Sequence, residues 1–244
     1  MNSIATPEAA RGTRAPVAPV VRFEDVGLRG EPDGPPPLSF AMPPGDFLVL
    51  AGPAGCGKTA ILSLICLADR PAAGRVWLFG RDAATLGRND VATLRRRIGL
   101  VFAEDRLLEH LTVFDNAALV PRVIGHKRRD YAPRVAELLT WVGLGPKRDV
   151  LPAALSRGQR RRLAIARAVA NQPDILLADE PTGDLDGEAA LRVLRLLARI
   201  NEAGTAVLMA TRDEEVAASS GARVLHRREG RPKLIDAADE AMAS

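Results

Sequence analysis

The sequence predicts an α/β fold built around a mostly parallel sheet, and three observations support that class. A short apolar segment at 47–51 runs directly into a glycine-rich loop and then into a helix at 58–69. Two further apolar segments, 175–178 and 206–209, flank a helical stretch at 189–200. Strands that alternate with helices in this way are typical of parallel sheets, because a parallel crossover usually contains a helix.

The other elements are assigned in chain order. Residues 20–26 alternate between apolar and polar side chains like a half-buried strand, and the proline- and glycine-rich segment 30–37 is a loop. Residues 98–102 are another buried apolar strand. Residues from about 104 to 165 are predicted to be mainly helical, with breaks at prolines and glycines.

Length and composition indicate one globular domain with short tails. Residues 19–232 are long enough to enclose one large core, in which 104–165 is a helical subdomain. Residues 1–18 are expected to be a disordered tail and 233–244 a C-terminal tail. No apolar run reaches the roughly 20 residues of a membrane-spanning helix, and the start does not resemble a signal peptide. We therefore expect a cytoplasmic protein that reaches the membrane only through a partner.

Charge and cysteine content exclude few functions. The net charge of +4 suits acidic nucleotides, anionic lipids and nucleic acids about equally well. The two cysteines, Cys56 and Cys66, are too few for a disulfide framework or a zinc site. We expect both to be packing thiols in a reducing compartment.

A glycine-rich loop with a phosphate-binding pattern follows the strand at 47–51. Its residues are Gly52, Pro53, Ala54, Gly55, Cys56, Gly57, Lys58 and Thr59, with Ala60 next in the chain. The glycines let the backbone wrap a polyphosphate with its N–H groups pointing inward. We expect Lys58 to contact the β- and γ-phosphates and the Thr59 hydroxyl to ligate Mg²⁺. Ala60 stands where such loops usually carry a second hydroxyl.

Two adjacent carboxylates follow the strand at 175–178. Asp179 and Glu180 lie at the carboxyl end of that strand, which is the edge where open α/β sheets bind ligands. We expect Asp179 to hold a metal ion through water and Glu180 to polarise an attacking water. A solvated turn is the alternative, and the phosphate loop earlier in the chain favours the catalytic interpretation.

These motifs resemble those of the nucleotide-binding subunits of ABC transporters, over residues 20–231. The signature motif of that family is matched by Ser156, Arg157, Gly158 and Gln159, and its D-loop by 182–186. The resemblance implies an ABC-type P-loop ATPase core with a mostly parallel sheet, an antiparallel β part and a helical subdomain. It also implies a head-to-tail dimer, in which the signature of one chain caps the ATP of the other. The expected cofactors are therefore ATP and Mg²⁺, and a second copy of the chain is one expected partner.

Within the family, segments at 64–66, 105–108, 112–116 and 205–211 resemble most closely the cell-division subunit FtsE. Such subunits partner the membrane protein FtsX and couple the ATP cycle to cell-wall hydrolases outside the membrane. The resemblance implies a permease-like membrane partner, a peripheral position at the cytoplasmic face of the inner membrane, and no nucleic acid. ATPases of lipoprotein-release and macrolide exporters share much of the sequence in these segments, and they are the alternative.

Four positions depart from the pattern of an efficient ATPase of this family. Ala103 stands where a glutamine that touches Mg²⁺ and the water is usual. Strand alternation sends the neighbouring Glu104 to the opposite face, although a short irregular loop would bring it back. Arg157 replaces the first glycine of the signature. The segment between Val26 and Leu38 has no aromatic residue to stack on adenine, and Arg29 is the candidate substitute.

The fourth departure is Arg212, which replaces a histidine that contacts the γ-phosphate. An arginine there either stabilises charge in the transition state or binds the ground state too tightly. With Glu180, Lys58 and Arg212 as catalytic residues, we expect an ATP-binding subunit with slow, partner-dependent hydrolysis. The alternative is an ATP-gated assembly module, in which binding drives dimerisation and hydrolysis matters little.

Overall fold

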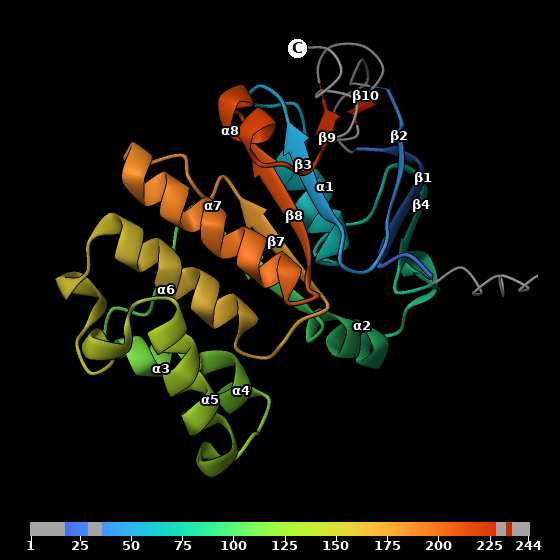
Figure 1. Cartoon of the computed structure of the whole chain (residues 1–244). Helices are drawn as coiled ribbons and strands as arrows, with labels where there is room; N and C mark the ends of the chain where they lie inside the picture. Colours follow the sequence, from blue (N-terminus) through green and yellow to red (C-terminus); the bar gives the residue numbers. More distant parts are fainter. Residues whose placement is uncertain (1–17, 29–35, 228–232, 236–244) are drawn as a thin grey trace, which may run out of the picture.

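The computed structural model describes residues 18–28, 36–227 and 233–235, and Figure 1 shows them as a central sheet flanked by helices and a smaller sheet. The strands are β1 (Val21–Gly27), β2 (Leu38–Met42), β3 (Phe47–Ala51), β4 (Ala73–Leu78), β5 (Arg81–Asp82), β6 (Ile98–Val101), β7 (Ile175–Asp179), β8 (Ala206–Thr211), β9 (Arg223–His226) and β10 (Lys233–Ile235). The helices are α1 (Lys58–Ile65), α2 (Arg88–Arg95), α3 (Val113–Ala117), α4 (Leu119–Val123), α5 (Arg128–Trp141), α6 (Arg157–Val169), α7 (Gly187–Glu202) and α8 (Glu214–Ser219).

The central sheet has the strand order β10-β9-β3-β8-β7-β6. The strands from β9 to β6 pair in parallel, and β10 adds an antiparallel edge. The predicted mostly parallel sheet is thus confirmed. In such a sheet the carboxyl ends of β3 and β7 lie at the same edge, which brings the phosphate loop close to the carboxylates after β7.

Strand β3 shows why the central strands are apolar along their whole length. Side chains alternate between the two faces of a strand. Leu48 and Leu50 join a buried cluster with α1 and the small sheet, whereas Val49 and Ala51 join the cluster formed with α6 and α7. Because both faces are covered, neither face needs polar side chains.

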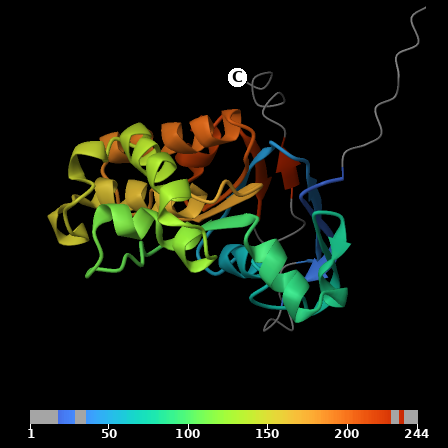
Figure 2. The same ribbon diagram turned by 90° about the horizontal axis from the view of Figure 1, so that it is seen from below.

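The small sheet is antiparallel and has the strand order β2-β1-β4-β5. Phe23 of β1 lies opposite Phe40 of β2, and their ring centres are 4.8 Å apart. The strand predicted at 20–26 is β1, shifted by one residue. Figure 2 shows this sheet at one end of the molecule and the helical subdomain at the other.

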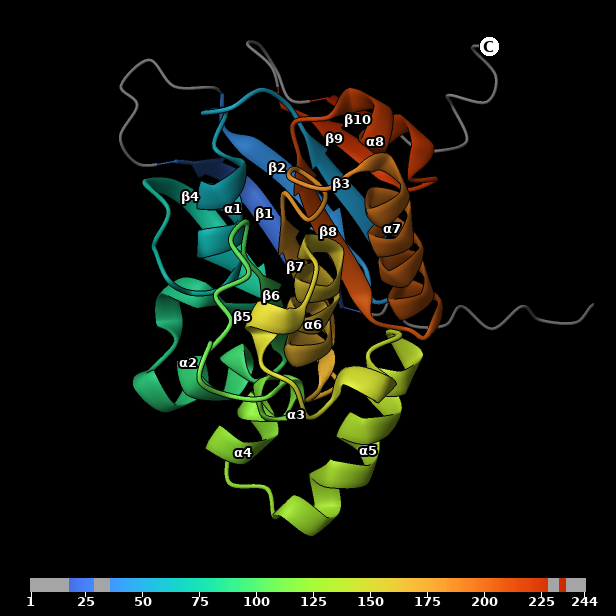
Figure 3. The ribbon, with the colours of Figure 1, turned by 90° about the vertical axis from the view of Figure 1, so that its left-hand side faces the viewer.

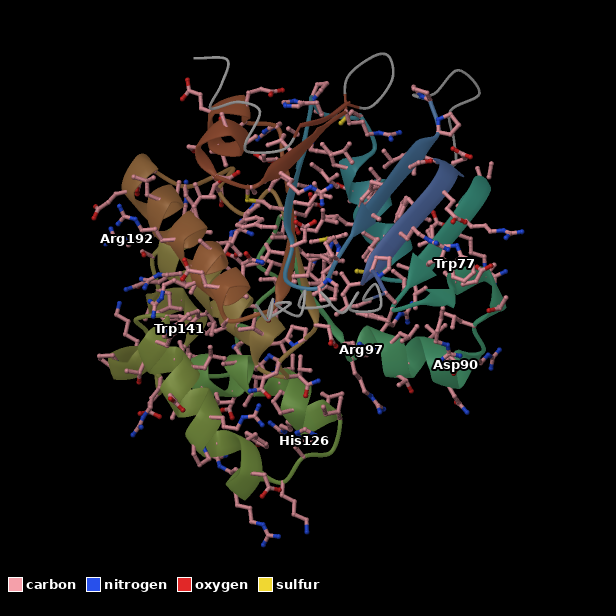
Figure 4. The ribbon with its side chains drawn as sticks, turned by 45° about the vertical axis from the view of Figure 1, so that its right-hand side comes forward. Trp77, Asp90, Arg97, His126, Trp141 and Arg192 are labelled. Carbon is pink, nitrogen blue, oxygen red and sulfur yellow. The ribbon has the colours of Figure 1, made fainter. Side chains whose placement is uncertain are left out.

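Helices α3, α4 and α5 form the helical subdomain. At the end of α5, the Trp141 ring lies 4.6 Å from the guanidinium carbon of Arg199 on α7, which links the subdomain to the core. Figure 4 shows Trp141 where the two parts meet. The prediction of helical structure from about residue 104 was wrong for the first residues of that stretch. Residues 104–112 form an irregular loop, and α3 begins only after Thr112.

Buried Asn116 stabilises this irregular loop through its side-chain amide. Its Oδ1 accepts a hydrogen bond from the Leu108 N–H at 2.9 Å. Its Nδ2 donates at 3.0 Å to the carbonyls of Leu108, Leu111 and Thr112. These bonds satisfy backbone groups that a helix would have paired internally, so the loop persists beside the core without regular structure.

The ends of the predicted elements differ from the structure in several places. The helix expected at 58–69 is α1, which ends at Ile65. Strand β10 falls in the stretch assigned to a C-terminal tail. The predicted tails and loop lie outside the described residues over 1–17, 30–35 and 236–244. Within the described ranges, no helix is both long enough and apolar enough to span a bilayer.

Candidate active site

The phosphate loop connects β3 to α1 and depends on glycine at two points. Gly57 precedes α1 with a φ of 88°, and a Cβ there would lie 2.3 Å from Cδ1 of Leu28. At Gly52, a Cβ would lie 2.3 Å from the carbonyl oxygen of Arg227. Any other residue at either position would clash with its neighbours. The glycines predicted from the sequence therefore allow close packing as well as the left-handed backbone.

Lys58, the first residue of α1, is only 6% exposed. Its Nζ donates to the carbonyls of Gly52 and Pro53 at 2.8 and 3.0 Å, and it lies 3.7 Å from Oε1 of Glu180. The ammonium group is thus held at the centre of the loop by groups of the chain itself. A phosphate entering the loop would meet this charge together with the N-terminus of α1.

The carboxylates after β7 lie next to the phosphate loop, as predicted. The Thr59 hydroxyl donates to Oδ2 of Asp179 at 2.9 Å. The other oxygen, Oδ1, is buried and has no hydrogen-bond partner among the residues that the structure describes. A hydroxyl beside a carboxylate with an unused oxygen matches what Mg²⁺ takes from proteins, namely oxygen ligands and bound water.

Glu180 has a strained backbone, with a φ of 44°. Its N–H donates to the Ala210 carbonyl at 2.9 Å, and its Oε2 accepts from the N–H of Arg212 at 3.2 Å. Left-handed backbone is uncommon for residues other than glycine and tends to occur at functional sites. Both hydrogen bonds run to β8 or to the residue after it, so the adjacent strand holds the carboxylate in place.

Lys58, Thr59 and Glu180 line one hollow of about 740 Å³, called here the phosphate-loop cavity, whereas the buried Asp179 does not line it. The phosphate loop and the start of α1 contribute Ala54, Gly55, Gly57, Lys58, Thr59 and Ala60. Other segments contribute Ala103, Glu104, Glu180, Gly183, Asp184 and Arg212. Of the predicted loop residues, Gly52, Pro53 and Cys56 shape the loop without lining the cavity.

Glu104 lies in the cavity wall, which strand alternation alone did not predict. The carbonyls of Phe102 and Ala103 both accept hydrogen bonds from the guanidinium of Arg161, each at 2.7 Å. Successive carbonyls of a strand point in opposite directions, so these bonds show that the alternation stops after Val101, where β6 ends. The irregular loop therefore brings Glu104 to the same cavity as Ala103.

The predicted signature residues lie in a second hollow of about 440 Å³, called here the signature hollow. It is lined by Ser156, Arg157, Gly158, Gln159, Arg162, Asp184, Leu185, Asp186, Ala189 and Arg192. Asp184 borders both hollows, so the D-loop lies between them. Arg192 projects from α7 at the outer edge of the molecule (Figure 4).

Within the signature hollow, the side chains of Ser156 and Gln159 form a capping box at the start of α6. The Gln159 N–H donates to the Ser156 hydroxyl at 3.3 Å. Oε1 of Gln159 accepts from the N–H of Ser156 and from Nζ of Lys147, both at 3.0 Å. The Gln159 side chain is therefore used to cap its own helix and to bind Lys147. Arg157 is exposed at the first turn of the same helix.

Sequence reasoning missed the role of Arg161, one residue in an arginine-rich stretch of α6. Its side chain is 2% exposed and lies 3.1 Å from Oδ1 of Asp184 and 3.3 Å from Oδ1 of Asp105, besides binding the two carbonyls. Burial raises the pKa of the Asp105 carboxyl, and the charge of Arg161 acts in the opposite direction. One guanidinium thereby joins the signature helix, the loop after β6 and the D-loop.

Arg227 is a second buried arginine whose role sequence reasoning missed. It follows β9 and is 2% exposed, and its N–H donates to the Ala51 carbonyl at 2.7 Å. Its Nε donates to the carbonyl of Cys56 inside the phosphate loop. The C-terminal part of the fold therefore helps to fix the loop.

The family model for "ABC transporter" matches residues 36–183. The chain belongs to the ABC transporter family. The match ends at Gly183 and so includes the phosphate loop, the signature residues and the carboxylates after β7. The recognition from sequence motifs is confirmed, and the chain is an ATP-binding cassette of the ATPase type.

Several curated relatives carry the name "Cell division ATP-binding protein FtsE". The one from Escherichia coli is 40% identical over 216 residues, which are 86% of this chain and 96% of the relative. The one from Mycobacterium tuberculosis is 45% identical over 195 residues, or 80% and 84% of the two chains. The predicted likeness to FtsE within the family is confirmed.

Solved structures of cassettes share the fold. A dimeric post-hydrolysis state of the ATP-binding cassette MJ0796, bound to ADP and Pi, is 28% identical, with a TM-score of 0.77 over 89% of this chain and 98% of that one. A cbiO1 structure from Clostridium perfringens, at 23% identity and a TM-score of 0.83, supports the fold alone. The α/β cassette with parallel and antiparallel sheets is thereby confirmed.

Proposed function

We propose that the chain is the motor subunit of a membrane complex, in which two copies close on two MgATP molecules and hydrolyse them slowly. The observation that supports this proposal is that the phosphate-loop residues and the signature residues line two separate hollows. Lys58 and Glu180 line the phosphate-loop cavity, whereas Ser156 and Gly158 line the signature hollow. Each copy would then complete the site of the other, which agrees with the dimeric form of the similar cassette MJ0796.

The residues of the phosphate-loop cavity fit a magnesium ion bound with the nucleotide. Thr59 would ligate the ion through its hydroxyl, and Asp179 would hold one of its waters through Oδ1. The ion would supply neutralising charge at the β- and γ-phosphates. Lys58 would bind the same phosphates, and Glu180, fixed by the Arg212 N–H, would orient and polarise the attacking water.

Slow hydrolysis is proposed because two side chains of the cavity differ from those the family resemblance implies. Ala103 has no polar side-chain atom, and Arg212 cannot accept a proton at neutral pH. Losing one hydrogen bond that stabilises a transition state typically costs about a hundredfold to a thousandfold in rate. Two such losses need not multiply, because residues that act as a unit are non-additive.

The partner is proposed to be a permease-like membrane protein similar to FtsX, acting in cell division and cell-wall remodelling. The FtsE names of the relatives support this role, and the exporter ATPases remain the alternative. A hollow of about 410 Å³ between the core and the helical subdomain, near residues 104–125, is the proposed contact. Its lining includes Phe102, Leu119, Val120 and Arg106. The chain would then lie peripherally at the cytoplasmic face of the inner membrane.

The first test is steady-state ATP turnover of the purified protein beside Glu180→Gln, with nucleotide binding measured on both samples. We expect slow turnover that the substitution abolishes while binding persists. Turnover that is equal in both proteins would contradict the role of Glu180.

A second candidate function is an ATP-gated assembly module, favoured by Ala103 and Arg212. It predicts nucleotide binding without turnover that depends on Glu180, also when the membrane partner is added. In cells it predicts that Glu180→Gln supports normal division, whereas the motor predicts a division defect.

A further inference from the structure

Glu104 is one of three carboxylates that line a cavity proposed to bind an anionic nucleotide. The phosphate-loop cavity holds two cationic side chains, Lys58 and Arg212, but also the carboxylates of Glu180, Glu104 and Asp184. A carboxylate facing a triphosphate is repelled by it unless a cation lies between them. Glu180 already has partners in Lys58 and the Arg212 N–H, which leaves the role of Glu104 to be explained.

We propose that Glu104 holds a water ligand of the magnesium ion of bound MgATP, a contact that Ala103 cannot make. This inference rests on the proposed function, since it concerns the same cavity. Among the described residues no three Asp, Glu, His or Cys side chains converge on one point as a metal cluster. Contact through water agrees with that geometry, because Mg²⁺ usually keeps several waters and takes few protein ligands directly.

The backbone beside Glu104 is fixed from behind by Arg161. Its guanidinium binds the carbonyls of Phe102 and Ala103 and lies 3.3 Å from the carboxylate of Asp105, so both residues adjoining Glu104 are anchored. Arg167 adds a bond of 2.7 Å to the Asp105 carbonyl. The Glu104 side chain is exposed and lines the cavity, whereas the carboxylate of the next residue, Asp105, lies against Arg161.

Arg161 is therefore a positioning residue for Glu104. The planar guanidinium can donate to two carbonyls and a carboxylate at once, which the ammonium of lysine cannot do with the same geometry. Arg161 also contacts Asp184, but if the anchoring matters for the metal contact, a change at Arg161 alters the Mg²⁺ midpoint through Glu104. The two residues should then be non-additive in any measurement of the metal.

The test measures binding of a fluorescent ATP analogue to the full chain while the Mg²⁺ concentration is varied, and no catalysis is needed. We expect Glu104→Ala to raise the Mg²⁺ concentration for half-maximal binding about tenfold, the lower end for lost outer-shell contacts to a metal. Binding without Mg²⁺ should not weaken. The matched control is Glu109→Ala, which removes a carboxylate from the same loop outside the cavity lining and should leave the Mg²⁺ midpoint unchanged.

Two further variants sharpen the test. Ala103→Gln added to Glu104→Ala supplies a polar side chain one residue earlier, and we expect it to recover most of the shift. Arg161→Lys should raise the Mg²⁺ midpoint on its own but not when Glu104 is already alanine. If Arg161→Lys does not fold, the first pair of variants still decides the matter.

The inference is overturned if Glu104→Ala leaves the Mg²⁺ midpoint unchanged, or tightens binding equally with and without Mg²⁺. The second result would mean that the carboxylate only repels the nucleotide. In both cases a wild-type protein that needs Mg²⁺ for tight binding leaves the proposed function intact. A wild-type protein that binds no nucleotide would instead contradict the proposed function itself.

Discussion

Arg212 contributes to the cavity twice, since its main-chain N–H donates to Glu180 while its exposed side chain lines the wall. Arg212→Ala should keep the first contact and remove the second. We expect kcat to fall at least about tenfold with little change in KM, because a cation beside the γ-phosphate stabilises charge that develops during transfer. Steady-state kinetics at saturating Mg²⁺ measure this.

A change in KM in place of kcat would have a different meaning. A higher KM with an unchanged kcat would show that Arg212 binds the ground state as tightly as the transition state. Arg75→Ala is a suitable control, because Arg75 is exposed on β4 and lines neither hollow. It should change neither constant.

The Cys66 thiol should react slowly although it is partly exposed. Burial raises the pKa of the Cys66 thiol to about 11, so only about one molecule in a thousand is thiolate at pH 8. Its labelling by a maleimide should therefore be slow at pH 8 and rise roughly tenfold per pH unit up to pH 10. Labelling of a Cys56→Ala variant measures this, and a rate independent of pH would contradict it.

At the scale of the helix, Ser156→Ala separates stability from function. Ser156 caps α6 by accepting from Gln159, and Thr112 caps α3 by accepting from Asp115 at 3.1 Å. Each alanine variant should lose about 1 kcal/mol of unfolding free energy, which is typical for an N-cap. Only Ser156→Ala should also weaken ATP-dependent pairing of two chains, because Ser156 lines the signature hollow. Chemical denaturation and light scattering provide the two measurements.

The elements predicted best from the sequence are those whose local pattern matches their burial. Strands β3, β7 and β8 are apolar throughout because both faces of the sheet are covered. The loop at 104–112 was predicted as helix because its apolar residues resemble a helical pattern. In the structure its backbone groups are bound by the side chains of Arg167 and Asn116, and Arg161 binds the carbonyls of Phe102 and Ala103 just before the loop. All three of these partners come later in the chain. Local periodicity contains no information about such partners.

At the scale of the whole molecule, the site likewise has a part that the sequence motifs predict and a part that depends on contacts between distant segments. Figure 3 shows α1 beside β7 near the centre of the molecule, although these two elements are far apart in the sequence. The sequence motifs predicted that Lys58, Thr59 and Glu180 would converge, because the edge of a parallel sheet collects the residues that follow its strands. They did not predict that Arg161 turns the loop after β6 or that Arg227 supports Cys56. Those contacts depend on tertiary packing.

Pairing of two chains is the property that tests the proposed division of the site most directly. With Glu180→Gln to prevent turnover, MgATP should convert a largely monomeric protein to a dimer, because the nucleotide binds the closed pair and not the separate chains. A negative charge introduced by Arg157→Glu should oppose this conversion, since the signature hollow would then repel the phosphates of the other copy. Light scattering with and without MgATP measures the fraction of dimer.

The matched control is Arg75→Glu, which changes the net charge equally on the small sheet, away from both hollows. If it impaired the dimer as strongly as Arg157→Glu, the effect would be one of overall charge. If Arg157→Glu dimerised normally with MgATP, the signature hollow would not face the second nucleotide. The head-to-tail arrangement requires instead that only the Arg157 variant loses the dimer while still binding ATP as a monomer, because the phosphate-loop cavity of each chain is unchanged.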